Sequence, residues 1–143
     1  MSKGNTFEND FLKLIFQAVA IADLAENDAT SPLTDLWVSL HTGDPGETGD
    51  QTTSEATYTG YARVSVVRTS SGWAVTNNIA DNVGAINFGQ CTAGSNTITH
   101  FAVGTASSGV GKILFYGVLT ASLAVSPGIT PSFAAGALDC TED

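Results

Sequence analysis

One imidazole and three carboxylates lie at intervals of three residues in one polar segment: His41, Asp44, Glu47 and Asp50. Hard cations such as Ca²⁺ bind several carboxylate oxygens, so a calcium site is one interpretation of this cluster. The spacing differs from that of an EF-hand, and Asp-Pro-Gly is a strong turn sequence by itself. Because acidic runs usually stay in water, we favour a solvated loop and predict no metal site and no cofactor.

A glycine-rich segment, Ala106-Ser-Ser-Gly-Val-Gly-Lys-Ile113, resembles a phosphate-binding loop. Ala106 stands where that loop has its first glycine, and Ile113 stands where a Ser or Thr would bind magnesium. The residues after Lys112 favour a strand, whereas a phosphate loop needs the N-terminus of a helix. We therefore predict a hairpin connection between two strands and no nucleotide site.

Catalytic groups are few in this sequence. His41 and His100 are its two imidazoles, and His100 lies in a strand pattern, where we expect a structural role. The sequence has no Gly-x-Ser-x-Gly elbow and no His-Glu-x-x-His motif, and Cys91 and Cys140 lack metal-ligand spacing. We treat both cysteines as thiols and leave their pairing open. A carboxylate pair for glycoside hydrolysis also stays open, since its separation is spatial, but we expect that the protein is not an enzyme.

The elements that must position these residues begin with one long helix, predicted over residues 5–27. Asn5 can cap it with Glu8 three residues later. Apolar residues then recur at spacings of three and four in two neighbouring rows, so the middle of the helix is apolar almost all round. Either a second layer of this chain covers the additional face, or a partner subunit does. The partner interpretation makes the following residues interface candidates: Phe7, Phe11, Leu14, Ile15 and Val19.

The same segment is neither a signal peptide nor a membrane span by its sequence. Glu8 and Asp10 lie where a signal peptide has positive charge. The apolar run is interrupted by Gln17 and is shorter than the ~18 apolar residues expected of a membrane-spanning helix.

After Asn27 the apolar period changes from 3.6 to 2, which indicates short strands separated by Gly, Asn, Ser and Pro. A long polar loop, residues 43–60, follows the first of them. We predict strands at 35–42, 61–68, 72–76, 84–88, 97–103, 112–119 (with continuation to 125 left open) and 131–138. The predicted fold is mainly β: an antiparallel β-sandwich or barrel preceded by one N-terminal α-helix. We expect a helical segment, 1–30, and a β-sandwich domain, 31–143, in a single structural unit.

Aromatic residues on the strand patterns are expected in the core, because each buries a large area. Tyr58 and Tyr61 differ, since they flank the polar loop. They are further interface candidates, with packing at the edge of the core as an equal alternative.

Charge is scarce in this chain of 143 residues: 13% of residues are charged, against roughly 25% in typical proteins. Fourteen acids and five bases give a net charge of −9, so we expect neither a nucleic-acid partner nor an anionic membrane. The polar remainder is largely 18 Thr, 13 Ser and 15 Gly, which favour strands and tight turns. The acids gather at the predicted helix, the 44–55 loop and the C-terminal tail. The strands are left nearly neutral and available for protein contact.

Six segments, in this order, resemble small virion proteins of tailed bacteriophages: Leu40-His-Thr-Gly-Asp-Pro-Gly46, Tyr61-Ala-Arg63, Ile86-Asn-Phe88, Ile98-Thr-His-Phe-Ala-Val103, Tyr116-Gly-Val-Leu119 and Ser126-Pro-Gly128. Proteins of this type serve as tail fibres or as capsid decoration (cement) proteins. The resemblance covers roughly residues 33–138. It implies a β-sandwich and symmetric assembly, and it supplies no catalytic residues.

Taken together, the resemblance and the neutral strands predict an outer-capsid decoration protein that stabilises the capsid lattice through protein–protein contacts. We expect it to bind copies of itself, as a homotrimer, and the major capsid protein. Its expected location is the outer capsid surface of the virion, after assembly in the host cytoplasm. The alternative is a tail-fibre or baseplate component that contacts the host receptor.

Overall fold

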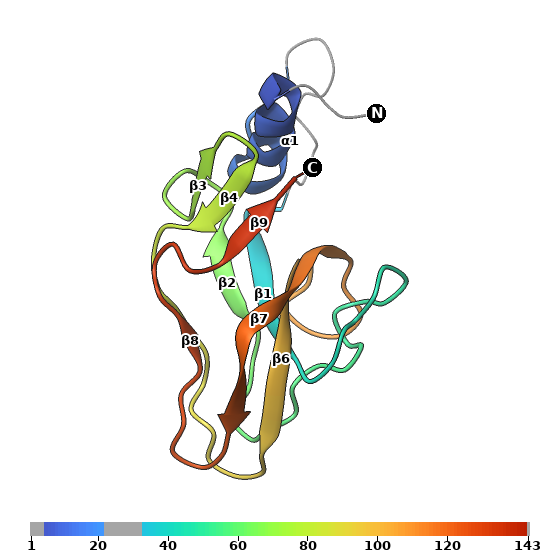
Figure 1. Cartoon of the computed structure of the whole chain (residues 1–143), viewed down its shortest axis with the longest axis vertical. Coiled ribbons are helices and arrows are strands. Elements are labelled where there is room, and N and C mark those ends of the chain that lie inside the picture. The colour runs from blue at the N-terminus through green and yellow to red at the C-terminus, as the bar shows by residue number, and fades with distance from the viewer. Residues whose placement is uncertain (1–4, 22–32, 143) are drawn as a thin grey trace. The chain divides into compact units, whose positions relative to one another are not determined.

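The computed structural model describes residues 5–21 and 33–142 (Figure 1). Within these residues one helix precedes nine strands, in this order: α1 (Asn5–Gln17), β1 (Asp35–His41), β2 (Val64–Val67), β3 (Trp73–Thr76), β4 (Ile79–Asn82), β5 (Ile86–Asn87), β6 (Asn96–Gly104), β7 (Ile113–Val125), β8 (Ser132–Phe133) and β9 (Asp139–Thr141). The recorded pairings between these strands are antiparallel. The mainly-β prediction with one N-terminal helix is confirmed, and no sheet closes into a barrel within the described part. None of the described helices is long and apolar enough to cross a membrane.

The chain divides into two compact units. The first unit comprises the described parts of Met1–Asp35, Val66–Ala85 and Phe133–Asp143. The second comprises Leu36–Ser65 and Ile86–Ser132. The predicted boundary at residue 30 lies outside the described residues, so the division into 1–30 and 31–143 stays a prediction.

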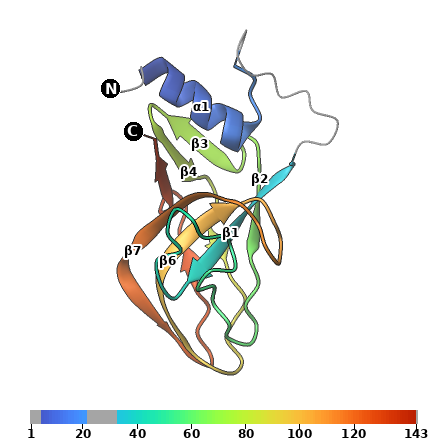
Figure 2. The same cartoon turned by 90° about the vertical axis from the view of Figure 1, so that its right-hand side faces the viewer.

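In the first unit, α1 packs against β3 and β4, as Figure 2 shows. Leu12 and Phe16 point from the helix into the core and are completely buried, as is Trp73 of β3. The rings of Phe16 and Trp73 meet edge to face, with centroids 4.6 Å apart. The Gln17 amide also donates to the Trp73 carbonyl at 3.0 Å. The sheet that contains β3 and β4 therefore covers one apolar face of the helix.

The helix ends at Gln17, ten residues before the predicted end at 27, of which 22–27 lie outside the described residues. Ala18 takes a left-handed φ of 57°, a conformation that ends helices. The Arg68 guanidinium donates hydrogen bonds to the carbonyls of Leu14 and Ile15 in the last turn, where helical carbonyls lack partners of their own. A cation there also suits the negative end of the helix dipole.

The three-stranded sheet of this unit has the order β3-β4-β9. Its central strand carries Asn82, a polar residue whose side chain is completely buried. Asn82 donates to the Gly84 and Ala134 carbonyls and accepts from the Ala137 and Leu138 N–H groups, at 2.7–3.1 Å. These bonds fix the segment that leads into β9. Neither β4 nor β9 was predicted.

The second unit contains most of a four-stranded sheet with the order β2-β1-β6-β7, in which β2 spans the division between the units. The register pairs Trp37 with Gly104 and His41 with His100 between β1 and β6. β6 and β7 form a long hairpin, visible in Figure 1, and its connection lies at the glycine-rich segment 105–112, as predicted. The core residues of this sheet come mainly from β1 and β6: Leu36, Val38, Leu40, Ile98, Ala102 and Val103.

Candidate functional site

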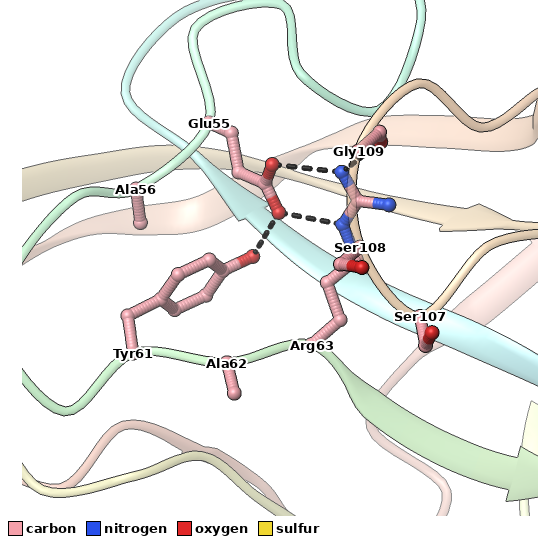
Figure 3. Close-up of a pocket in the computed structure, with 8 residues that line it drawn as sticks. All are labelled: Glu55, Ala56, Tyr61, Ala62, Arg63, Ser107, Ser108 and Gly109. Carbon is pink, nitrogen blue, oxygen red and sulfur yellow. Dashed lines mark hydrogen bonds and ion pairs between the residues drawn. The ribbon is translucent and has the colours of Figure 1, made fainter.

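A buried ion pair is the centre of the best-formed site in the second unit (Figure 3). Glu55 lies in the polar loop, where its backbone pairs with His41 in an isolated antiparallel β-bridge, and Arg63 immediately precedes β2. The two side chains bind through two parallel bonds: Nε to Oε1 at 2.6 Å and Nη2 to Oε2 at 2.8 Å. The Arg63 side chain is 2% exposed and that of Glu55 is 18% exposed. Such bidentate pairs combine strength with a fixed geometry.

Two carbonyls of the β6–β7 connection also bind Arg63. Its Nη1 donates to the Ala106 carbonyl at 2.9 Å, and its Nη2 donates to the Gly109 carbonyl at 2.8 Å. The hydrogen bond to Glu55 raises the pKa of Arg63 above its ordinary value, so the guanidinium stays charged. Arg63 thus connects the polar loop to the segment from which β7 begins.

Tyr61 completes this cluster. Its hydroxyl donates to Glu55 Oε1 at 2.9 Å and accepts the Leu40 N–H at 3.1 Å. Its ring stacks on Phe88, with centroids 6.2 Å apart and planes 13° from parallel. Burial raises the pKa of Tyr61, so its phenol stays protonated and keeps donating to the carboxylate.

A shallow cavity of about 280 Å³ lies beside the ion pair. Its lining residues are Glu55, Ala56, Tyr61, Ala62, Arg63, Ser107, Ser108 and Gly109 (Figure 3). The charged groups in this wall already bind each other, the phenol and backbone carbonyls. The arrangement therefore holds the β6–β7 connection in place, which is a structural role.

Gln51 is a second anchor for the same connection and is completely buried. Its side chain donates to the Trp37 carbonyl at 3.2 Å and accepts the Ala106 N–H at 3.0 Å. A Cβ added at Gly104 or at Gly111 would meet Gln51 at 2.2 Å. A side chain at either position would therefore displace the buried Gln51 amide, and at Gly111, within the segment that resembles a phosphate loop, it would also meet the Ala106 Cβ at 2.7 Å.

The acidic segment 41–50 does not converge into a metal site in the described residues. His41 is completely buried, with Nε2 2.9 Å from the Ser39 hydroxyl and Nδ1 2.8 Å from the Thr53 carbonyl. Burial lowers the pKa of His41, which favours the neutral ring. Asp44 accepts the Gly46 N–H, and Asp50 accepts the Thr52 N–H and hydroxyl, which lower the pKa of Asp50. The carboxylates thus stabilise turns of the loop.

The remaining histidine and the two cysteines that the sequence analysis considered lie within the fold. His100 lies in β6, where the sequence places it, and its Nδ1 is 2.8 Å from the Thr99 hydroxyl. Cys91 and Cys140 are free, buried thiols. Burial raises the pKa of Cys140, so this thiol stays protonated.

The tyrosine interface candidates lie inside the second unit. Tyr58 is only 3% exposed, and its hydroxyl donates to the Gly89 carbonyl at 3.0 Å. Of the two alternatives for Tyr58, the structure shows packing within the unit and not an exposed contact. Tyr61 is half-buried and serves the ion pair described above.

The helix candidates are partly accessible. Phe11, Leu14 and Ile15 are half-buried, and Val19 is 47% exposed beyond the end of α1. The side chain of Phe7 lies outside the described residues. A partner subunit on this surface stays a prediction, whereas the opposite face of α1 is covered by β3 and β4.

Glu55, Arg63 and Gln51 were missed as a group by the sequence analysis. One signal was available for Arg63, because it is one of five basic residues and immediately precedes an apolar strand segment. A charge in that position needs a buried partner. No comparable signal marks Gln51, because its contacts to 37, 106 and 111 are distant in sequence.

The mainly-β fold and the structural character of this site agree with a virion structural protein of tailed phages. A family model described as "Podophage GP4 fiber I protein gp80" matches residues 3–141, and the chain belongs to this family. The predicted resemblance to tailed-phage virion proteins is thereby confirmed, and the location is the virion. No curated protein matches the chain.

Proposed function

We propose that this chain is a structural subunit of the phage tail fibre and that it acts through protein–protein contacts. The match to a fibre family over residues 3–141 is the observation that carries this proposal. The charged groups of the candidate site support it, since Glu55 and Arg63 bind each other and the chain's own backbone. The subunit joins copies of itself. Its net charge of −9 disfavours binding to the packaged genome, which is also negatively charged.

Capsid decoration, with the major capsid protein as partner, is the second candidate. The neutral surface of β7, which has no charged residue, favours a protein partner in either location. The two functions differ in stoichiometry, because a decoration protein covers a lattice and a fibre protein occupies only the tail.

Copy number and position in purified particles test the proposal. Quantitative mass spectrometry should give a number of copies far below that of the major capsid protein, and immunogold labelling should mark the tail. A copy number comparable to that of the major capsid protein, with gold over the head, would overturn the fibre assignment in favour of decoration. The same immunogold labelling of particles that lack DNA is the control for access of the antibody to its epitope.

A further inference from the structure

The outer edge of β7 lacks a partner strand in the described part of the chain. β7 is the last strand in the order β2-β1-β6-β7, and it pairs with β6 on one side only. It has 13 residues, whereas β6 has nine. The regular ladder runs from Val103–Phe115 to His100–Val118, followed by a shift in register before Ile98–Leu123. An edge of this length presents backbone N–H and C=O groups that can pair with another strand.

The composition of β7 is unusual for an edge strand. Its sequence, Ile-Leu-Phe-Tyr-Gly-Val-Leu-Thr-Ala-Ser-Leu-Ala-Val, contains no charged residue and no proline. Only Val125 is buried, and Val118 is 71% exposed. Edge strands of monomeric proteins are commonly protected by charges or proline against pairing with other chains. β7 has neither form of protection, so its regular part, from Phe115 to the register shift after Val118, is open to pairing with another chain.

We propose that β7 pairs with β7 of a second copy of this chain, antiparallel and about a two-fold axis. This inference deepens the proposed function, because a fibre subunit has to join copies of itself. The pairing would continue the sheet from one copy into the next through main-chain hydrogen bonds. It would also predict a dimer in place of the trimer expected from the sequence.

Charge and length both favour a second copy as the occupant. Two chains that each carry a charge of −9 repel one another unless their facing surfaces are neutral, and all 13 residues of β7 are neutral. The strand at the other edge of the sheet, β2, has only four residues. Among the strands that the structure describes, only another β7 matches the length of this edge, and a two-fold axis brings the same surface of both copies together.

Side chains on the solvent face would add to the backbone pairing. Tyr116 and Val118 are two residues apart, so both point to the same face of the sheet. They are 36% and 71% exposed. With the two-fold axis at Val118, this residue would lie opposite Val118 of the second copy as a cross-strand apolar pair, with Tyr116 two residues further along the same face.

The variant Val118→Glu tests this interface in the purified full chain. It places a carboxylate on the neutral strand of each copy, and like charges across a pair of strands are destabilising. Light scattering after size exclusion should give twice the 14.7 kDa chain mass for the wild type and a single chain mass for the variant. The dissociation constant should rise by about tenfold or more.

Val110→Glu is the matched control, since Val110 is 78% exposed and lies in the hairpin connection outside β7. It makes the same change of charge and should leave the dimer intact, as should the neutral variant Val118→Thr. Circular dichroism establishes that every variant is folded. If Val118→Glu were unfolded, Val118→Lys and Tyr116→Glu would make the same test.

A monomeric wild type at micromolar concentration, or a trimer mass, would overturn the β7–β7 pairing. So would equal dissociation constants for Val118→Glu and Val110→Glu. None of these outcomes depends on where the protein sits in the particle. The fibre assignment fails only by copy number and labelling, so the failure of one proposal is distinguishable from the failure of the other.

Discussion

α1 and β7 are both rich in apolar residues, but their apolar residues have different environments. In α1, Leu12 and Phe16 are completely buried against β3 and β4 of the same unit. In β7, only Val125 is buried, and Val118 is largely exposed. One element is thus covered within the chain, and the other is open.

The distribution of charge explains this difference. α1 carries Asp10 and Lys13 at partly accessible positions, whereas its sheet covers Leu12 and Phe16. β7 carries no charge on either face. An uncharged strand with an exposed apolar residue such as Val118 gains stability when another chain covers it. The comparison therefore assigns α1 to the fold and β7 to assembly, and four substitutions test it.

Phe16→Ala should have the largest effect on stability, about 3–5 kcal/mol, because it opens a cavity against Trp73. Denaturant unfolding measures the loss. Val19→Ala is the control, since Val19 is 47% exposed and should change stability by no more than about 0.5 kcal/mol. A Phe16→Ala protein as stable as the control would show that the sheet does not cover α1.

Arg63→Met should cost about 2–4 kcal/mol, because the Glu55 carboxylate loses its charged donor and two carbonyls lose the hydrogen bonds from Arg63. The expected loss is set below that of a fully buried pair since Glu55 is 18% exposed. Arg63→Lys keeps the charge and should recover part of the loss. A double-mutant cycle with Glu55→Gln should give a coupling energy well above zero, and additive losses would contradict the Glu55–Arg63 ion pair described here.

Arg68→Gln should cost about 1–2 kcal/mol, because the charged donor to the carbonyls of Leu14 and Ile15 is lost at a partly buried site. Faster amide exchange confined to the last turn of α1 would identify the cause. The exposed Lys112 offers a control, Lys112→Gln, that removes the same charge elsewhere. Equal stability of the two variants would argue against Arg68 as the cap.

Val118→Glu should have the smallest effect on the folded monomer, no more than about 0.5 kcal/mol, because Val118 is 71% exposed. The measurement is chemical unfolding in dilute solution, where the wild type is dissociated. A large loss of monomer stability would show that β7 is covered within the chain, which would remove the contrast with α1.

Local patterns predicted β1, β6 and β7 well. Alternating apolar residues and glycine-rich turns indicated strands at 35–42, 97–103 and 112–119, and the structure has Asp35–His41, Asn96–Gly104 and Ile113–Val125. These segments could be predicted because the alternation lies within the segment itself. The hairpin at 106–111 followed from the same patterns.

Contacts between distant residues account for what was missed. β4 contains Asp81 and Asn82, polar residues that disfavour strands, and Asn82 is stabilised by carbonyl and N–H groups more than 50 residues away. The helix was predicted too long because its apolar period continues past Ala18. Its end depends on Arg68, which is also more than 50 residues away. The choice between contact and packing stayed open for Tyr58 because the hydrogen-bond partner of its hydroxyl, Gly89, is 31 residues away.

Hydrogen exchange of the purified chain tests most directly that β7 is covered by assembly and α1 by the fold. We predict that peptides from residues 113–125 are protected in the wild-type dimer and exchange faster in Val118→Glu, because main-chain pairing is lost. Peptides from α1 should exchange equally in both proteins. Equal exchange in 113–125, or a change in α1 alone, would contradict the account.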